Sequence, residues 1–487
     1  MEEKITRFEY VYRHLSADIE RGALAPGDLL PSMHDLCSCY QVGIGTVRDV
    51  LHALKVDGYI VLEERKRAVV AHRASDVDER ICACELVARR EEVLDCFRTL
   101  ELVMPPLFVL ASRSCTDEEL DELVRAARLV GRRQRDEAWR LSRSSSVLHG
   151  LLGKAGNPLL SSCYTSLERI GRIPIVSGYE SPYTRATADA EPGLLAWMFS
   201  ALKLRDEEEA LRRFRRMYQG TARYVEAYLD ELAVEYPACR KDDGEAAYSW
   251  NAKAGLDYVH GRIARNLVER IAMGEIADGE LLPSIAELSS AYEVSHATIQ
   301  KALSMLNAIG IAKTVNGLGT RVCLGRESFH DRWLDHLSFR RDVSTYVRAV
   351  QMFCAVLPPA LAEAAPRIDE IAEEVERILV AEEGEWATTK ALIEGFVACV
   401  EPAPLRTILL ELNELLLWGR FFMLFATSKQ RAEELLLLAD QAIKRLRDRD
   451  AEGFAVSMTA YYRLMFQAVR AFLERAGMAG AEQLLEP

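Results

Sequence analysis

The sequence predicts a mainly α protein in which two winged helix-turn-helix modules, each with a small β-wing, alternate with two all-α helical bundles of the ligand-binding type. Three observations lead to this prediction. The chain of 487 residues is too long for a single hydrophobic core. A segment near its start returns 252 residues later, which indicates an internal repeat. The remainder of each copy reads as successive amphipathic helices joined by short connections.

The repeat is clearest at a Leu-Leu-Pro-Ser tetrapeptide, which occupies residues 29–32 and again residues 281–284. Turn glycines and apolar helix positions return at the same offset without a gap: Gly22 and Gly274, Leu36 and Leu288, Thr46 and Thr298, Leu51 and Leu303, Gly58 and Gly310. We therefore predict winged helices at 1–75 and 255–326, helical domains at 80–237 and 328–480, and a polar linker at 238–254.

The elements of the second module follow from local signals. An apolar stripe at helical spacing over 258–271 predicts the first helix. Ser284, with Glu287 three residues later, predicts a capping box at the start of the second helix. Ser295 is placed to cap the third helix, and short β-like runs around 317–319 predict a hairpin wing. This order of elements places one helix in a DNA major groove.

At these residues the chain resembles the GntR family of bacterial transcription regulators. That family shows the patterns Gly-x-Leu-x-x-Gly-x-x-Leu-Pro-Ser, Val-Ser-Arg and Gly-x-Gly in turn. Residues 274–284, 294–299 and 317–320 follow them closely here. The resemblance implies binding of double-stranded DNA by both modules.

Both copies depart from the family at positions that contact DNA. The family's Arg after the Leu-Pro-Ser corner is replaced by His34 and Ala286, and its Ser-Arg helix start becomes Gly43-Ile44 and Ser295-His296. The first copy also lacks the wing glycines. The remaining candidates for DNA contacts are Ser32, His34, Thr46, Arg48, Arg65, Lys66 and Arg67 in the first copy, and Ser284, Ser295, His296, Thr298, Gln300, Lys301, Gly317, Gly319 and Arg321 in the second.

The helical domains resemble the effector domains of the FadR-like subgroup of that family. Many members hold a metal ion with an Asp-x-x-x-His pair and two further histidines, but here Ser145 stands four residues before His149 and no histidine follows until His260. The resemblance thus implies an organic effector and no metal or other cofactor. Arg98, Glu101 and His149 are the candidate effector contacts, and Arg98 and Glu101 are expected to face the bundle interior. The prolines at 105–106 and 358–359 are expected to kink or break their helices.

Charge and composition narrow the function further. The net charge is −13, yet residues 4–73 carry ten Lys/Arg against nine Asp/Glu, so the acidic excess lies outside the modules. No nucleophile elbow or phosphate loop occurs, which argues against an enzyme. The eleven cysteines include no Cys-x-x-Cys pair, so we expect buried core thiols, with a thiol sensor as the alternative.

We therefore expect a cytoplasmic one-component transcription regulator that does not associate with membranes. Its partners would be an asymmetric DNA operator and an unknown small-molecule effector. With two winged helices per chain, we expect an intramolecular pseudo-dimer, or a homodimer of such chains. The alternative function is an interaction or adaptor protein that descends from such a regulator and has lost specific DNA binding.

Overall fold

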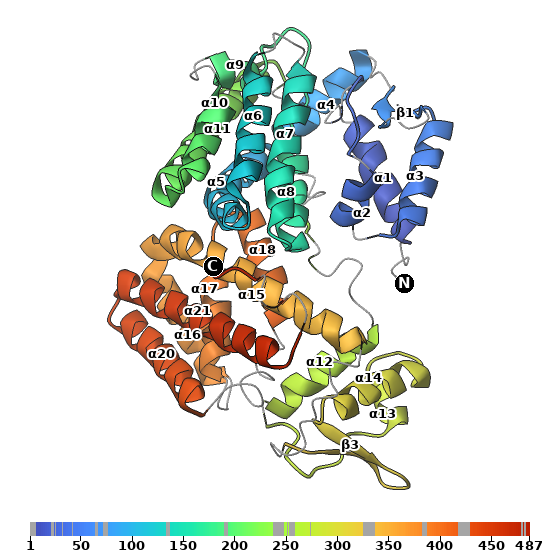
Figure 1. The fold of residues 1–487 in the computed structure, drawn as a ribbon, viewed down its shortest axis with the longest axis vertical. Helices are drawn as coiled ribbons and strands as arrows, with labels where there is room; N and C mark the ends of the chain where they lie inside the picture. Colours follow the sequence, from blue (N-terminus) through green and yellow to red (C-terminus); the bar gives the residue numbers. More distant parts are fainter. Residues whose placement is uncertain are drawn as a thin grey trace. The chain divides into compact units, whose positions relative to one another are not determined.

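The computed structural model is dominated by helices, with two small antiparallel hairpins, and confirms the predicted fold class (Figure 1). It describes residues 6–20, 24, 26–31, 33–40, 42–63, 67–71, 76–132, 137–188, 193–236, 248–250, 252, 259–272, 274–324, 337–381, 387–416, 429–478, 481 and 484–487. The chain forms two compact units. Unit 1 comprises Met1–Gly255 with Pro402–Thr407, and unit 2 comprises Leu256–Glu401 with Ile408–Pro487.

Unit 1 begins with winged helix 1. Its elements are α1 (Arg7–Glu20), α2 (Met33–Tyr40), α3 (Ile44–Val56), β1 (Ile60–Val61) and β2 (Val69–Val70). The two strands pair in antiparallel fashion, and a bridge from Leu29 to Val69 adds a third segment to the wing. The apolar faces of the helices and strands enclose a core of their own, which includes Leu15, Leu30 and Leu54. The module therefore has the compact helix, turn, helix and wing that its repeat pattern predicts.

Lobe 1, the helical part of unit 1, follows this module. Its helices are α4 (Asp76–Ala88), α5 (Arg90–Ser112), α6 (Asp117–Arg132), α7 (Glu137–Lys154), α8 (Pro158–Gly171), α9 (Pro182–Ala188), α10 (Leu194–Lys203) and α11 (Glu207–Glu235). The long helices α5 and α11 pack along each other, and α5 also contacts α7 and α8. Cys84 in α4 is disulfide-bonded, whereas the buried Cys96, Cys115 and Cys163 of this lobe are free thiols.

The end of the predicted linker is packed against lobe 1. Residues 237–247 lie outside the described part of the chain, but Tyr248, Trp250 and Ala252 are buried. The Trp250 Nε1–H donates to Ser162 Oγ at 3.1 Å, and the Tyr248 hydroxyl lies 2.7 Å from Ser166 Oγ. Both serines belong to α8. The end of the predicted linker is therefore packed against the lobe, because two aromatic rings and an alanine supply apolar area within a polar run.

Unit 2 repeats the arrangement. Winged helix 2 consists of α12 (Val259–Ala272), α13 (Ile285–Ala291), α14 (His296–Ala308), β3 (Ala312–Val315) and β4 (Gly319–Val322). Lobe 2 consists of α15 (Leu337–Ala364), the short 3-10 helix η4 (Ala365–Arg367), α16 (Ile368–Ala381), α17 (Ala387–Ala398), the part of α18 (Ala403–Leu415) that follows Thr407, α20 (Lys429–Arg447) and α21 (Ala451–Arg475). The stretch Asp342–Ala381 is long and apolar enough to cross a membrane by composition, but 67% of its apolar window is buried inside the protein, as in a core helix.

The paired prolines do not end their helices. Pro105 and Pro106 lie inside α5, and Pro358 and Pro359 lie inside α15, and both helices continue beyond them. Of the two expected outcomes, a kink or a break, the break does not occur. A proline inside a helix costs about 3 kcal/mol, and the buried residues on both sides of each pair, such as Met104 and Leu107, supply the packing that offsets this cost.

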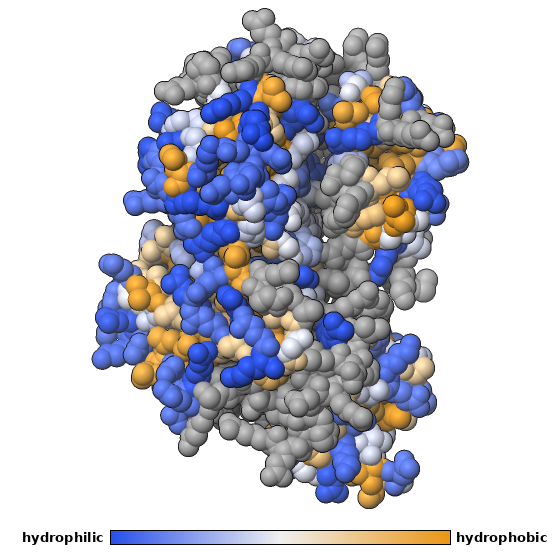
Figure 2. All heavy atoms as spheres, viewed as in Figure 1, coloured by the Kyte–Doolittle hydropathy of each residue, from blue (hydrophilic) through white to orange (hydrophobic). Residues whose placement is uncertain are grey.

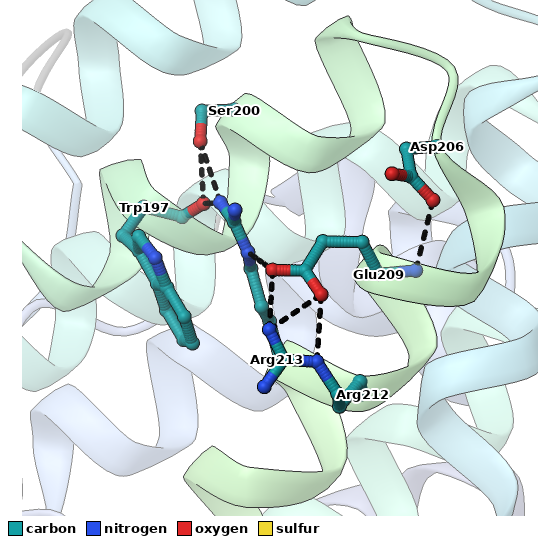
Figure 3. Close-up of polar contacts among 6 residues, drawn as sticks. All are labelled: Trp197, Ser200, Asp206, Glu209, Arg212 and Arg213. Atoms are coloured by element: carbon teal, nitrogen blue, oxygen red, sulfur yellow. Dashed lines mark hydrogen bonds and ion pairs between the residues drawn. The ribbon is translucent and has the colours of Figure 1, made fainter.

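A polar corner joins α10 to α11 in lobe 1 (Figure 3). Arg213 donates from Nη1 to the Trp197 carbonyl at 2.5 Å and to Ser200 Oγ at 2.8 Å, and from Nε to Glu209 at 2.6 Å. Its guanidinium carbon lies 4.4 Å from the centre of the Trp197 ring, and only 15% of its side chain is exposed. Arg212, by contrast, is 60% exposed and pairs with Glu209 alone in this corner.

We expect Arg213→Ala to lower the free energy of unfolding of lobe 1 by about 1–3 kcal/mol, because it removes charge-assisted hydrogen bonds from a half-buried site. Thermal unfolding of the full chain measures this change. Arg212→Ala is the matched control and should change the midpoint little, since exposed ion pairs stabilise weakly. Equal effects of the two substitutions would contradict the role assigned to Arg213.

Candidate nucleic-acid interface

Two serine caps set the helices of winged helix 2. Ser284 Oγ accepts from the Glu287 amide at 3.2 Å, and the Glu287 carboxylate accepts from the Ser284 amide at 2.7 Å, which completes the predicted capping box. Ser295 Oγ accepts from the Thr298 amide at 3.3 Å, as predicted for the start of α14. The hydroxyls of Ser295 and Thr298 also lie 2.9 Å apart. These groups therefore fix where α14 begins, which is their structural role whether or not they touch DNA.

The face of α14 that points away from the module core is polar and exposed. Ile299, Ala302, Leu303 and Leu306 are buried in the module, whereas His296, Gln300 and Lys301 are exposed. Thr298 is half-buried. Because a helix of this kind enters the major groove with its first turns, the exposed residues lie where base edges and phosphates would be reached.

The wing of winged helix 2 carries two neighbouring cations. In the β3–β4 register Lys313 stands directly opposite Arg321, and both side chains are exposed. Opposed like charges destabilise a hairpin, so this pair is better suited to an anionic partner than to the hairpin itself. Gly317 and Gly319 form the tip with φ of 80° and 114°, a region that favours glycine. Sequence reasoning missed Lys313, because only the strand register shows that it faces Arg321.

Asn307 joins α14 to this wing. Its Oδ1 accepts from the Thr314 amide at 2.9 Å and its Nδ2 donates to Thr314 Oγ1 at 2.7 Å. The wing is thereby held at a fixed place relative to α14. We use the name α14 surface for the exposed polar and cationic side chains of α14 and of the wing: His296, Gln300, Lys301, Lys313 and Arg321.

Winged helix 1 offers a weaker version of this surface. Gly43 precedes α3 without any side-chain cap. Arg48 is exposed and Thr46 is half-buried, but Asp49 is exposed at the position that Lys301 holds in the second copy. An acidic group there opposes phosphate binding. Of the other candidates, Ser32, Arg65 and Lys66 lie outside the described residues, as does the side chain of His34 in α2.

Arg67 is anchored within unit 1. Its Nε–H donates to the Leu30 carbonyl at 2.9 Å, and the side chain lines a cavity that winged helix 1 shares with lobe 1. A contact of Arg67 with DNA stays a prediction, and the hydrogen bond to Leu30 restricts where this side chain can reach. A basic run in a loop does not reveal which of its members folds back, because that depends on the strand that follows.

Comparison with known proteins agrees with this geometry. The family model for bacterial regulatory proteins of the gntR family matches twice, at residues 8–70 and 260–322. The HTH-type transcriptional repressor NanR of Klebsiella aerogenes is 28% identical over 214 residues, which cover 42% of this chain and 79% of that repressor. The HTH-type transcriptional regulator TreR of Bacillus subtilis is 36% identical over 70 residues, 14% of this chain and 29% of that regulator.

Residues 8–70 and 260–322 each match the model of the gntR family of bacterial regulatory proteins, so the chain contains two copies of a GntR-family module. The segment that aligns with the NanR repressor makes up less than half of this chain but most of that repressor. Among solved structures, Streptococcus agalactiae GntR is similar at 14% identity with a TM-score of 0.18, over 43% of this chain and 99% of that one. A TM-score that low establishes no shared arrangement of the parts.

The candidate effector residues in lobe 1 have different surroundings. Arg98 on α5 is exposed, so the expectation that it faces the bundle interior is wrong; the helix buries the faces of Phe97 and Leu100 instead. Glu101 is half-buried and accepts from Gln219 Nε2 at 2.7 Å. His149 on α7 is half-buried, and its Nε2 lies 3.2 Å from a Glu168 carboxylate oxygen.

Glu168 is the centre of a polar network on α8. Its second carboxylate oxygen accepts from Arg172 at 3.0 Å. Burial raises the pKa of the Glu168 carboxyl, but the charge of Arg172 and hydrogen bonds from His149 and Ser145 outweigh burial and hold that pKa well below its usual range. The same attraction raises the pKa of Arg172. Sequence reasoning missed Glu168 and Arg172, although their spacing of four residues on a helix was a usable signal.

We expect purified protein to contain no stoichiometric transition metal. The carboxylate nearest to His149 is already neutralised by Arg172, Ser145 replaces the family's aspartate, and no group of three or more metal-binding side chains occurs within the described part of the chain. Elemental analysis of protein purified without chelators checks this. About one metal ion per chain, lost on substitution of His149 by Ala, would contradict it.

Proposed function

We propose that this chain is a cytoplasmic one-component regulator that binds a specific, asymmetric DNA site through two unlike winged helices and responds to a small-molecule effector in its helical lobes. The observation that carries the proposal is the α14 surface, in which α14 exposes His296, Gln300 and Lys301 and the wing exposes the opposed cations Lys313 and Arg321. Because each chain supplies two modules, we propose an intramolecular pseudo-dimer, with a homodimer of chains as the alternative.

The two modules would contribute differently. On the α14 surface Gln300 can pair in bidentate fashion with adenine, whereas the matching residue of winged helix 1, Arg48, favours guanine or a phosphate. Lys301 and the pair Lys313–Arg321 would neutralise phosphates, which supplies affinity without sequence preference. Asp49 and the uncapped start of α3 give winged helix 1 less affinity. We therefore assign most of the DNA affinity to winged helix 2.

We expect Lys301→Ala and Arg321→Ala each to weaken binding to every DNA sequence and to reduce the magnitude of the salt slope, log K against log salt, by about 1. Fluorescence anisotropy with a genomic fragment from upstream of the gene, at several salt concentrations, measures both quantities. Lys444→Ala, an exposed lysine of α20, is the matched control and should leave binding unchanged. If the unaltered chain ignores DNA even at ~50 mM salt, the adaptor function is favoured instead.

We expect the preferred site to have two unlike halves. Gln300→Ala should relax base preference in one half only, by about 1–3 kcal/mol, and Arg48→Ala should affect the other half, because unlike helices read unlike sequences. Selection of bound fragments followed by sequencing, repeated with each variant, gives the preference at every position. A site of two identical inverted halves that both respond to the Gln300 change would mean that winged helix 2 alone reads DNA, from each chain of a homodimer.

A further inference from the structure

A cavity of about 400 Å³ lies inside unit 1, between winged helix 1 and lobe 1. Helices α1 and α2 of the module form one wall and helices α7 and α8 of the lobe form the other, and α2 packs against α8 beside it. This size lies within the range of sites for small organic ligands, which occur preferentially between domains. None of the residues of the α14 surface lines this cavity.

Small residues on α7 create the space. Ser146, Gly150 and Gly153 follow one another along the face that lines the cavity. No atom lies within 4 Å of the position that a Cβ on Gly153 would take. The lobe therefore leaves a gap opposite the module at the place where larger side chains would have closed it, although glycine inside a helix costs about 1 kcal/mol relative to alanine.

The two walls differ in chemistry. Winged helix 1 contributes mostly apolar side chains, among them Leu24, Leu29 and Leu36, together with the charged Asp18 and Arg67. Leu29 is 38% exposed although its module has a full core. Lobe 1 contributes the charged side chains of α8, Glu168, Arg169 and Arg172. A ligand with a hydrocarbon part toward the leucines of the module and a polar group toward α8 of the lobe fits this lining.

Among the described residues, Arg169 is the charged group of this wall that no hydrogen-bond or ion-pair partner satisfies. Glu168 and Arg172 pair with each other at 3.0 Å, and His149 completes their network. Arg169 is half-buried, yet its guanidinium forms no ion pair or hydrogen bond with any residue that the structure describes. A partly desolvated guanidinium with five donors suits a carboxylate. Because Asp18 and Glu168 line the same cavity, a singly charged anion fits better than a dianion such as a phosphate monoester.

We propose that this cavity binds a small amphipathic monocarboxylate, with its carboxylate on Arg169 and its hydrocarbon part against the leucines of winged helix 1. Such a ligand touches both walls, so it holds the module on lobe 1 and restricts the position from which α3 can reach DNA. This inference rests on the proposed function only for its regulatory consequence, since binding itself requires no DNA.

The test uses the full chain and octanoate as the probe, with 1-octanol and octylammonium as probes of equal chain length and different charge. Isothermal titration calorimetry should show saturable binding of octanoate and much weaker binding of the other two. Arg169→Gln should weaken octanoate binding by about ten- to hundredfold, and Arg169→Lys by less. Arg215→Gln, an exposed arginine of α11, is the matched control and should have no effect.

A second variant fills the cavity without removing a charge. Gly153→Trp should abolish octanoate binding, because its Cβ would lie in open space at the cavity wall and the indole would occupy the cavity. The unfolding midpoint of the free variant, measured beside it, shows that the loss is not due to unfolding. Hydrogen exchange with octanoate present should slow at the amides of α2 and α8 in the unaltered chain and remain unchanged in this variant. That pattern separates a ligand between the two walls from one bound elsewhere.

Three results would overturn the inference: no saturable binding of octanoate, equal binding of octanoate and 1-octanol, or equal affinity of the Arg169→Gln and Arg215→Gln proteins. Failure of the proposed function would look different, since the chain would then ignore DNA in the anisotropy assay while the calorimetric results stood. Loss of octanoate binding with intact DNA binding would remove the inference and leave the regulator.

Discussion

The burial of α8 on nearly all sides is the constraint on which unit 1 depends. Its apolar positions, such as Leu160, Cys163 and Leu167, are buried among the lobe helices. Ser162 and Ser166 of α8 form hydrogen bonds with Trp250 and Tyr248. Helix α2 of winged helix 1 packs against α8 as well. The N-terminus of α8 is well defined, because Asn157 caps it and Pro158 follows at the first helical position. A shift of α8 cannot leave the module, the lobe or the connecting segment unchanged, because each loses buried contacts.

The two copies share a fold but attach their modules differently. In unit 2 the first helix of the module meets lobe 2 through α12 and α15, and Arg265 pairs with Asp342 at 2.8 Å with only 8% and 10% of their side chains exposed. In unit 1 the equivalent residue, Arg13, is exposed, and contact is made through α2 and α8. Removal of one partner of a buried ion pair strongly destabilises a protein, so the Arg265–Asp342 pair fixes winged helix 2 on lobe 2 at one point. Winged helix 1 instead contacts lobe 1 across an interface that contains a cavity.

Much of this architecture could be predicted from the sequence because the signals are local. The capping box at Ser284, the cap at Ser295 and the glycine wing tip each depend on residues a few positions apart. The internal repeat then predicts the equivalent elements of the other copy. Features set by tertiary contact could not be predicted. The hydrogen bond of Arg67 to Leu30, the docking of Trp250 and the opposition of Lys313 to Arg321 each need a register or a packing partner that no spacing reveals. The prolines of α5 belong to the same group, since burial around them decides whether the helix continues.

Magnitudes limit what a ligand in the cavity of unit 1 can do to DNA binding. To shift a two-state equilibrium from 1:99 to 99:1, a ligand must favour one state by about 5.5 kcal/mol. A chain of six methylenes gains at most about 5 kcal/mol on complete burial, at ~0.8 kcal/mol for each. Only the part that rests on Leu24, Leu29 and Leu36 distinguishes the docked module from a released one, because Arg169 lies on the lobe in both. The proposed ligand would therefore shift the population of winged helix 1 by a graded amount. Since winged helix 2 has its own attachment and carries most of the proposed affinity, such a ligand would adjust one half-site and leave the other occupied.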